Sequence, residues 1–241
     1  MQLTVIMPCY NEAPTLAESV ARVLAAELPE GVVRDVVIVD DASTDESRSI
    51  AERLANENDA VSFVTHPRNR GKGAAVRTGI EHASGDMVLI HDADLEYDPA
   101  DHAAAIEPIL DGKADAVIGT RFLGSRPHRV LYFWHYAANR FLTMLCDMVS
   151  NLNLTDMECC TKVMTREVAL AVQPNLREDR FGIEPELVIQ LSRARLSGNT
   201  PLRIYEVPVA YAGRTYADGK KIGWRDGIEA LQVIARLALT R

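Results

Sequence analysis

The chain has 241 residues, of which 47% are hydrophobic and 25% are charged, and its formal net charge is −8. This length and balance are typical of one globular domain with a sizeable core, and the acidic charge argues against a general nucleic-acid-binding protein, which is usually basic. The sequence has neither an apolar run of about 18 residues nor a basic stretch before its first apolar run, so we expect no membrane span and no secretory signal.

Strands and helices are predicted to alternate through the first half of the chain. Short apolar, β-branched runs predict buried strands, and the segments between them repeat apolar residues with the helical period. The expected strands are 3–8, 35–40, 60–66, 86–92 and 114–120, and the expected helices are 13–27, 45–56, 72–83 and 101–110. This alternation predicts a mainly parallel sheet covered by helices, with ligands at the carboxyl ends of the strands.

The second half of the chain is expected to be more helical. Its apolar periodicity predicts helices over 128–149, 165–171, 184–195 and 227–239. A strand is expected at 202–211, near the edge of the sheet because it contains Pro208. No internal repeat or low-complexity linker separates the halves, so we expect a single α/β domain over residues 1–241 whose two halves share one core.

Polar segments follow all five expected strands of the first half, whereas the strands themselves are apolar. These segments are 8–12 (PCYNE), 40–45 (DDASTD), 67–75 (PRNRGKGAA), 92–98 (DADLEYD) and 119–122 (GTRF). Because the carboxyl ends of parallel strands meet at one edge of a sheet, the pattern predicts a single polar site along that edge.

The fourth of these segments places Asp92, Asp94 and Glu96 two residues apart. In an extended chain such residues point to the same side, so their carboxylates are predicted to converge. Convergent carboxylates suit Mg²⁺ or Mn²⁺, held partly by the protein and partly by substrate phosphates. About one D-x-D sequence is expected by chance among the 17 aspartates of this chain, and the alternative is a solvated turn. Its position at a strand end favours the metal site.

The segment around Lys72 opens an expected helix after the third strand. Its glycines have neither the pattern of a dinucleotide-binding loop nor that of a P-loop. It is either a plain helix start or a phosphate contact, because a lysine and backbone N–H groups meet there. Similarly, Ser43 or Thr44 can cap the second helix without excluding a ligand role for Asp41.

Six ordered segments together resemble the family 2 inverting glycosyltransferases of the GT-A fold, and most closely the dolichol- and polyprenyl-phosphate sugar synthase branch. The segments are 8–12, 39–45, 69–80, 92–99, 119–122 and 206–224. The resemblance covers nearly the whole chain and implies a Rossmann-like sheet flanked by helices. It also implies a nucleotide-sugar-binding half (1–121) and an acceptor-side half with amphipathic helices (122–241).

The resemblance implies roles for individual residues. The implied nucleotide-sugar-binding residues are Pro8, Tyr10, Asn11, Glu12, Val39, Asp41, Lys72, Asp92, Ala93, Arg121, Lys220 and Lys221. By the same resemblance, Asp92, Asp94 and Glu96 would hold the divalent metal, Mg²⁺ or Mn²⁺. Many dolichol-phosphate mannose synthases have glutamine where this chain has Glu96, so the donor sugar stays open.

The implied reaction moves a sugar from a UDP- or GDP-linked donor, with inversion, to a polyprenyl phosphate. Asp94 would act through the metal, and Arg214 with Lys220 or Lys221 would stabilise the leaving diphosphate. A phosphate acceptor is already an anion and needs no strong base. A hydroxyl acceptor needs one, and Asp156 and Glu184 are the candidates, although each is also a plausible structural acid.

The segment 122–140 combines aromatic and basic residues and contains no Asp or Glu. A helix of this composition can lie in a membrane interface, with its rings at the headgroups and Arg126, Arg129 and Arg140 on anionic lipid. The alternative is that Leu131, Trp134 and Phe141 pack on the sheet.

The cellular setting follows from cysteine usage. Cys9, Cys146, Cys159 and Cys160 lack paired metal-site spacing and indicate free thiols in a reducing cytoplasm. We expect a cytoplasmic protein, or one peripheral on the inner face of the cell membrane. A homo-oligomer and a membrane partner protein are both left open.

Other functions compete with this prediction. The same donor chemistry could serve a soluble or cell-wall hydroxyl acceptor. A non-catalytic nucleotide-sugar-binding subunit would not need the acidic residues, or the cations Arg214, Lys220 and Lys221 near the C-terminus, that this chain contains. A nucleotidyltransferase usually has a glycine-rich phosphate loop after its first strand, and 8–12 has none.

Overall fold

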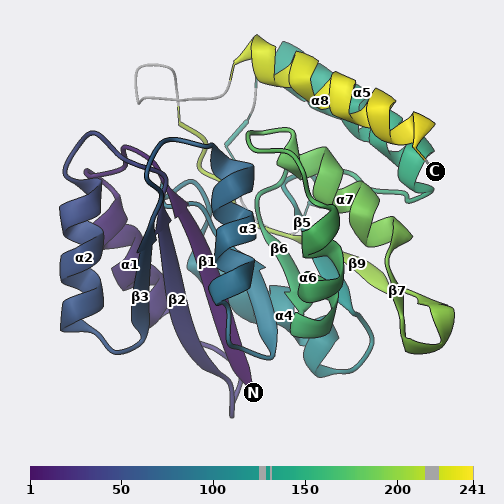
Figure 1. Cartoon of the computed structure of the whole chain (residues 1–241). Helices are drawn as coiled ribbons and strands as arrows, with labels where there is room; N and C mark the ends of the chain where they lie inside the picture. The colour runs from purple at the N-terminus through teal and green to yellow at the C-terminus, as the bar shows by residue number, and fades with distance from the viewer. Residues whose placement is uncertain (125–128, 131, 215–222, 241) are drawn as a thin grey trace.

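The computed structural model describes residues 1–124, 129–130, 132–214 and 223–240 (Figure 1). A seven-stranded sheet with the order β3-β2-β1-β4-β6-β5-β9 forms its centre. The strands are β1 (Gln2–Cys9), β2 (Val33–Asp40), β3 (Val61–Thr65), β4 (Met87–Ile90), β5 (Ala116–Thr120), β6 (Lys162–Thr165) and β9 (Ile204–Pro208). A separate hairpin pairs β7 (Arg195–Leu196) with β8 (Thr200–Pro201).

Helices cover both faces of this sheet. They are α1 (Leu16–Ala25), α2 (Ser47–Glu57), α3 (Lys72–His82), α4 (His102–Leu110), α5 (Phe133–Ser150), α6 (Arg166–Val172), α7 (Ile183–Arg193) and α8 (Trp224–Leu239). Three short 3-10 turns are η1 (Pro99–Asp101), η2 (Gln173–Asn175) and η3 (Ser197–Asn199). The fold is therefore the expected α/β architecture.

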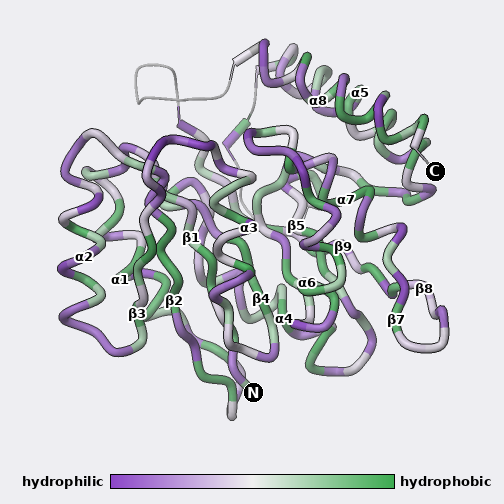
Figure 2. The backbone as a smooth tube through the Cα atoms, in the orientation of Figure 1, coloured by the Kyte–Doolittle hydropathy of each residue, from purple (hydrophilic) through white to green (hydrophobic). Residues whose placement is uncertain are grey.

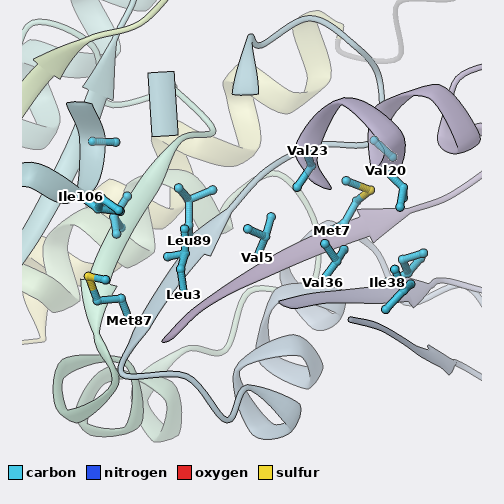
Figure 3. Packing of buried hydrophobic residues seen from close by; sticks show 14 of the residues in the cluster. Leu3, Val5, Met7, Val20, Val23, Val36, Ile38, Met87, Leu89 and Ile106 are labelled. Atoms are coloured by element: carbon cyan, nitrogen blue, oxygen red, sulfur yellow. The ribbon is translucent and has the colours of Figure 1, made fainter. Parts of the chain in front are cut away.

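Alternation along the strands divides the core between the two faces. Leu3, Val5 and Met7 of β1 join the cluster that α1, α2 and α4 cover (Figure 3), whereas Ile6 joins the cluster beneath α3, α6 and α7. Because each of these side chains is fully buried, each contributes about 1.5–3 kcal/mol of transfer free energy. Strands β2 and β3 are correspondingly hydrophobic (Figure 2).

The helices α5 and α8 lie side by side across the top of Figure 1 and pack with α7 around a third cluster. The buried face of α5 carries Asn139, Leu142, Thr143, Cys146 and Ser150. Trp134, Phe141 and Met148 are on the outer side of this helix, whereas Leu145 packs against the third cluster. Trp134 is 77% exposed and Phe141 51% exposed, so the alternative in which these two pack on the sheet is wrong, and Leu131 lies outside the described residues.

Strand β6 was not predicted, and it positions the candidate site. It runs antiparallel between β4 and β5, and its first residue, Lys162, pairs with Ile90 and Ile118. The loop that enters β6 therefore lies at the carboxyl ends of β4 and β5. A four-residue strand next to a helix start gives too short a periodic pattern to separate from that helix.

The other expected elements are present with boundaries shifted by a few residues. Strand β9 is at the edge of the sheet, as Pro208 predicted. All four cysteines are buried free thiols, also as predicted. Within the described residues, no helix is long and apolar enough to cross a bilayer.

Candidate active site

Loops after β1, β2 and β4 contain non-glycine residues in the left-handed backbone conformation. Asn11, Ala42 and Leu95 have φ angles of 52°, 57° and 62°. This conformation is uncommon outside glycine, persists only where surrounding contacts hold it, and clusters at functional sites. The three residues mark the carboxyl edge of the sheet as the candidate site.

Asn11 ties the loop after β1 to the loop after β2. Its backbone N–H donates to Ser43 Oγ at 3.0 Å, and its side-chain oxygen accepts from the N–H of Thr44 at 2.8 Å. Neither Ser43 nor Thr44 therefore caps α2, which begins without a side-chain cap. The expectation of a helix cap is wrong because these groups hold the loop of β1.

The predicted nucleotide-binding residues of β1, β2 and the acidic loop differ in accessibility. Tyr10 is 37% exposed and Pro8 is half-buried, so both can meet a ligand. Val39 and Ala93 are 0% and 1% exposed, and both pack in the core. Their side chains cannot line a ligand, because a strand end and the loop that follows it begin inside the hydrophobic layer.

Asp41 organises the loop between β3 and α3. Its carboxylate accepts hydrogen bonds from the N–H of Gly71 at 2.6 Å and the N–H of Arg70 at 2.8 Å, and it lies 2.7 Å from His66 Nδ1. Asp41 is 2% exposed, so its carboxylate holds this loop rather than facing solvent. Gly71 has φ of 102°, and a Cβ there would lie 2.4 Å from the carbonyl oxygen of Asp179. This position requires glycine.

Arg214, from the C-terminal part of the chain, contacts the loops after β1 and β4. Its Nη2 donates to Glu12 Oε2 at 2.8 Å and to the carbonyl oxygen of Asp94 at 2.6 Å. Its backbone N–H donates to Glu96 Oε1 at 2.7 Å. Arg214 thus connects the loop after β1 to the acidic loop after β4 and brings fixed positive charge beside three acidic residues.

Asp92 and Asp94 differ in their electrostatic environment. Burial alone would raise the pKa of the Asp92 carboxyl, but the Lys72 ammonium, 2.9 Å from its Oδ2, lowers that pKa below its usual value. Burial and the nearby charges of Asp92 and Glu96 raise the pKa of Asp94 to about 7. Asp94 therefore lies where negative charge is in excess.

Glu96 does not join the two aspartates. Its Oε2 accepts from Tyr211 Oη at 2.7 Å, and its Oε1 accepts from the N–H of Arg214. Within the described residues, no group of three or more His, Cys, Asp or Glu is arranged to hold a metal. The prediction of a three-carboxylate set is wrong because Leu95 is left-handed, which breaks the extended geometry that would align Glu96 with Asp94.

The remaining donor set still fits a hard divalent cation. Mg²⁺ is commonly held by one or two carboxylates together with substrate phosphates, so Asp92 and Asp94 suffice as protein ligands. Burial, and after it the charges of Asp92 and Glu96, raise the pKa of Asp94, and a cation beside these carboxylates would stabilise its ionised form.

Lys72 belongs to a chain of alternating buried charges. Its Nζ lies 2.9 Å from both Asp92 Oδ2 and Glu184 Oε1, and Lys162 binds the other oxygen of Glu184. Lys162 is fully buried, and its Nζ also donates to the carbonyl oxygens of Met157 and Cys159. Glu184 is therefore engaged by two lysines, so it is not the free base that was predicted for a hydroxyl acceptor.

Arg121 and Asp156 form a second buried pair. Arg121 Nε and Nη2 donate to the two oxygens of Asp156 at 2.6 and 2.7 Å, and Asn139 donates to Asp156 Oδ1 at 3.0 Å. The Arg121 guanidinium also lies 5.0 Å from the centre of the Tyr211 ring. Asp156 is 0% exposed, so it orients Arg121 and cannot serve as the predicted base.

Two predicted cations, Lys220 and Lys221, lie outside the described residues. The structure adds Lys162, Tyr211 and His66, which the sequence analysis did not single out. His66 is the last residue of the expected strand 60–66, and this position at a strand end is a signal that could have found it. Tyr211 lies within segment 206–224 of the family resemblance and Lys162 lies outside all six segments, and no sequence pattern marks either residue as a partner in the site.

Comparison with known proteins identifies the family of this chain. Residues 4–172 match the family model described as Glycosyl transferase family 2. The chain belongs to glycosyl transferase family 2. This match covers the loops that carry Glu12, Asp41, Lys72 and both aspartates, and therefore most of the candidate site.

Curated relatives of this family 2 chain include two named transferases. Glycosyltransferase AglJ of Haloferax volcanii is 31% identical over 78% of this chain and 58% of the relative. The undecaprenyl-phosphate 4-deoxy-4-formamido-L-arabinose transferase of Salmonella enteritidis is 28% identical over 91% of this chain and 62% of the relative. The chain thus spans about three fifths of the length of these relatives.

A solved structure shares the fold. The crystal structure of glucosyl-3-phosphoglycerate synthase from Mycobacterium tuberculosis, in complex with Mn²⁺, UDP and glucosyl-3-phosphoglycerate, superimposes with a TM-score of 0.70. It is 17% identical, and the match covers 98% of this chain and 80% of that chain. The fold of the family 2 chain is therefore the GT-A type that its sequence predicted.

Proposed function

We propose that the protein transfers a sugar from a nucleoside diphosphate sugar, UDP- or GDP-linked, to a polyprenyl-phosphate acceptor, with inversion. The observation that carries the proposal is the joining of Asp92, Asp94 and Arg214 at the carboxyl edge of the sheet in a family 2 chain. The acceptor is supported by the named substrate of the undecaprenyl-phosphate relative.

A divalent ion, Mg²⁺ or Mn²⁺, would be held by Asp92 and Asp94, and it would supply Lewis-acid stabilisation of the diphosphate. Around it, Arg214 adds fixed positive charge that needs no reorganisation during the reaction, because Glu12 already orients its guanidinium. Lys72 keeps Asp92 ionised and in place. Tyr10 and the loop held by Asp41 flank the space where the nucleotide would bind.

A donor screen tests this function. Nucleotide release should be measured with UDP- and GDP-sugars, with and without a short polyprenyl phosphate, before and after treatment with EDTA. We expect release that depends on the polyprenyl phosphate, disappears with EDTA and returns with Mg²⁺ or Mn²⁺. Release that requires a hydroxyl acceptor instead would point to the alternative acceptor class, and chelator-resistant release would contradict the metal role.

The outer face of α5 is the proposed contact with the membrane that contains the acceptor. Phe133, Trp134, Phe141, Met144 and Met148 are all at least half exposed, which is unusual for large apolar side chains on one helix. Residues 122–146 contain no acid, in a chain whose net charge is −8. An apolar, aromatic face without negative charge complements an anionic lipid surface.

Vesicle sedimentation checks this contact. We expect the protein to bind vesicles containing phosphatidylglycerol. The double variant Trp134→Ser, Phe141→Ser should bind them at least about tenfold more weakly, because two large apolar side chains no longer enter the interface. Val33→Ser is the matched control, since Val33 is 65% exposed at the opposite end of the sheet. Equal vesicle binding by the double variant and the wild type would contradict the contact. So would a wild-type protein that does not bind vesicles and instead forms a dimer through this face.

A further inference from the structure

Lys72 is shared between two carboxylates that come from different parts of the fold. Lys72 is the first residue of α3, Asp92 follows β4, and Glu184 lies in the first turn of α7. The Nζ atom of Lys72 lies 2.9 Å from Asp92 Oδ2 and also 2.9 Å from Glu184 Oε1. Its ammonium is therefore divided between a proposed metal ligand, Asp92, and a carboxylate outside the proposed metal site, Glu184.

Glu184 is held in place from its other side by Lys162. The Nζ atom of Lys162 binds Glu184 Oε2 and also donates to the carbonyl oxygens of Met157 and Cys159, at 3.3 and 2.6 Å. An ammonium group has three N–H donors, so these contacts use all of them and fix their directions. Lys162 is 0% exposed, so water does not compete for these donors. Glu184 Oε1 is therefore kept directed at Lys72.

This fixed position of Glu184 limits how firmly Lys72 holds Asp92. An ammonium with a single carboxylate partner neutralises that carboxylate, whereas an ammonium at equal distances from two carboxylates divides its attraction between them. A neutralised Asp92 would bind a divalent cation weakly, because the cation would have to displace Lys72 or approach beside its positive charge. A shared Lys72 instead anchors one oxygen of Asp92 and leaves this carboxylate part of its negative charge.

We propose that Glu184 is a positioning residue for the Asp92 carboxylate: it shares the ammonium of Lys72, so that Lys72 anchors Asp92 without closing it to a divalent cation. This inference rests on the proposed function, in which Asp92 holds Mg²⁺ or Mn²⁺. Glu184 acts through Lys72, and this dependence distinguishes its role from a direct effect of its charge on the cation and from a contribution to packing alone.

A double-mutant cycle on the affinity for Mn²⁺ tests the proposal. Mn²⁺ is titrated alone and followed by electron paramagnetic resonance, so that no contact between Lys72 and a nucleotide phosphate enters the measurement. We expect Glu184→Gln to weaken Mn²⁺ binding about tenfold, because Lys72 then pairs with Asp92 only. Lys72→Met should bind Mn²⁺ at least as tightly as the wild type, and in that background Glu184→Gln should change the affinity by less than about twofold. Glu167→Gln, on the exposed first turn of α6, is the matched control and should bind Mn²⁺ as the wild type does.

The folding of Glu184→Gln is checked by its melting temperature, because this variant leaves Lys162 without a charged partner. If it does not fold, the double variant Glu184→Gln, Lys162→Met removes both buried charges and takes its place in the cycle. Lys72 again has Asp92 as its remaining carboxylate partner of the two, so the same loss of Mn²⁺ affinity and the same dependence on Lys72 are expected.

The outcomes separate this inference from the function on which it rests. Unchanged Mn²⁺ affinity in Glu184→Gln, or an equal loss with and without Lys72, overturns the inference alone, because Glu184 then does not act through Lys72. Loss of Mn²⁺ binding in Lys72→Met also overturns it, because Lys72 would then support the site without having to be shared. A wild-type protein that binds Mn²⁺ only together with UDP or GDP overturns the inference and leaves the proposed function standing. No Mn²⁺ binding under any of these conditions overturns the proposed metal role, and the inference with it.

Discussion

Replacing Asp94 by asparagine is expected to lower turnover by about 10³-fold, which corresponds to about 4 kcal/mol. The substitution preserves size but removes a charged oxygen that the proposed metal needs. Binding of Mn²⁺, measured by calorimetry in the presence of the nucleoside diphosphate, should weaken in parallel. Turnover and Mn²⁺ affinity close to those of the wild type would rule out the metal role of Asp94.

The stability of the same variant distinguishes lost chemistry from lost structure. Folding raises the pKa of Asp94 to about 7, so the folded state disfavours the carboxylate at every pH above its ordinary value of 3.8. The penalty is complete above pH 7 and absent below about pH 4. We therefore expect the metal-free asparagine variant to melt at a higher temperature than wild type at pH 8 and at the same temperature near pH 4. Asp98→Asn is the matched control, because Asp98 lies on the same loop and asparagine can keep its hydrogen bond to the N–H of Ala100.

The largest loss of stability is expected from Glu184→Ala. It leaves Lys162, which is 0% exposed, without its carboxylate partner, and breaking a buried pair in this way typically costs about 3–5 kcal/mol. For a chain of this length the melting temperature should fall by about 10 °C, measured by calorimetry.

Removing the other partner of this ion pair, Lys162, provides a comparison. Lys162→Met should cost less, because Glu184 keeps its ion pair with Lys72 at 2.9 Å. The double variant Glu184→Gln, Lys162→Met should recover part of the loss. Glu167→Ala, an exposed glutamate on α6, should change stability by no more than about 0.5 kcal/mol. An equal or larger loss in Lys162→Met would show that the buried chain is not arranged as these contacts require.

The parallel part of the fold could be predicted because its signals are local. Buried runs such as Val36–Val39 and helices with a clear apolar period can each be recognised within a short window. Strand β6 could not, since four residues adjoining a helix do not establish a period. Its antiparallel insertion between β4 and β5 depends on packing across the sheet.

The sequence predicted which side chains gather at the carboxyl edge of the sheet, but it did not predict which of them are paired there. Polar segments at strand ends correctly located the edge where Asp92, Asp94 and Arg214 meet. Asp156 and Glu184 look like free acids in the sequence, but their partners Arg121 and Lys162 come from other elements. Glu96 also looks free in the sequence, but Tyr211 and the backbone N–H of Arg214 engage its two carboxylate oxygens.

The ion pair between Arg214 and Glu12 has a consequence for how the protein folds during its synthesis. The two residues are 202 positions apart, so a ribosome has translated most of the chain before the arginine can reach its partner. A nascent chain can form β1 to β4 with their loops, yet these loops lack the cation that joins them. A product truncated before Arg214 would therefore lack the cation that joins these loops, and we expect such a fragment to be inactive as a transferase.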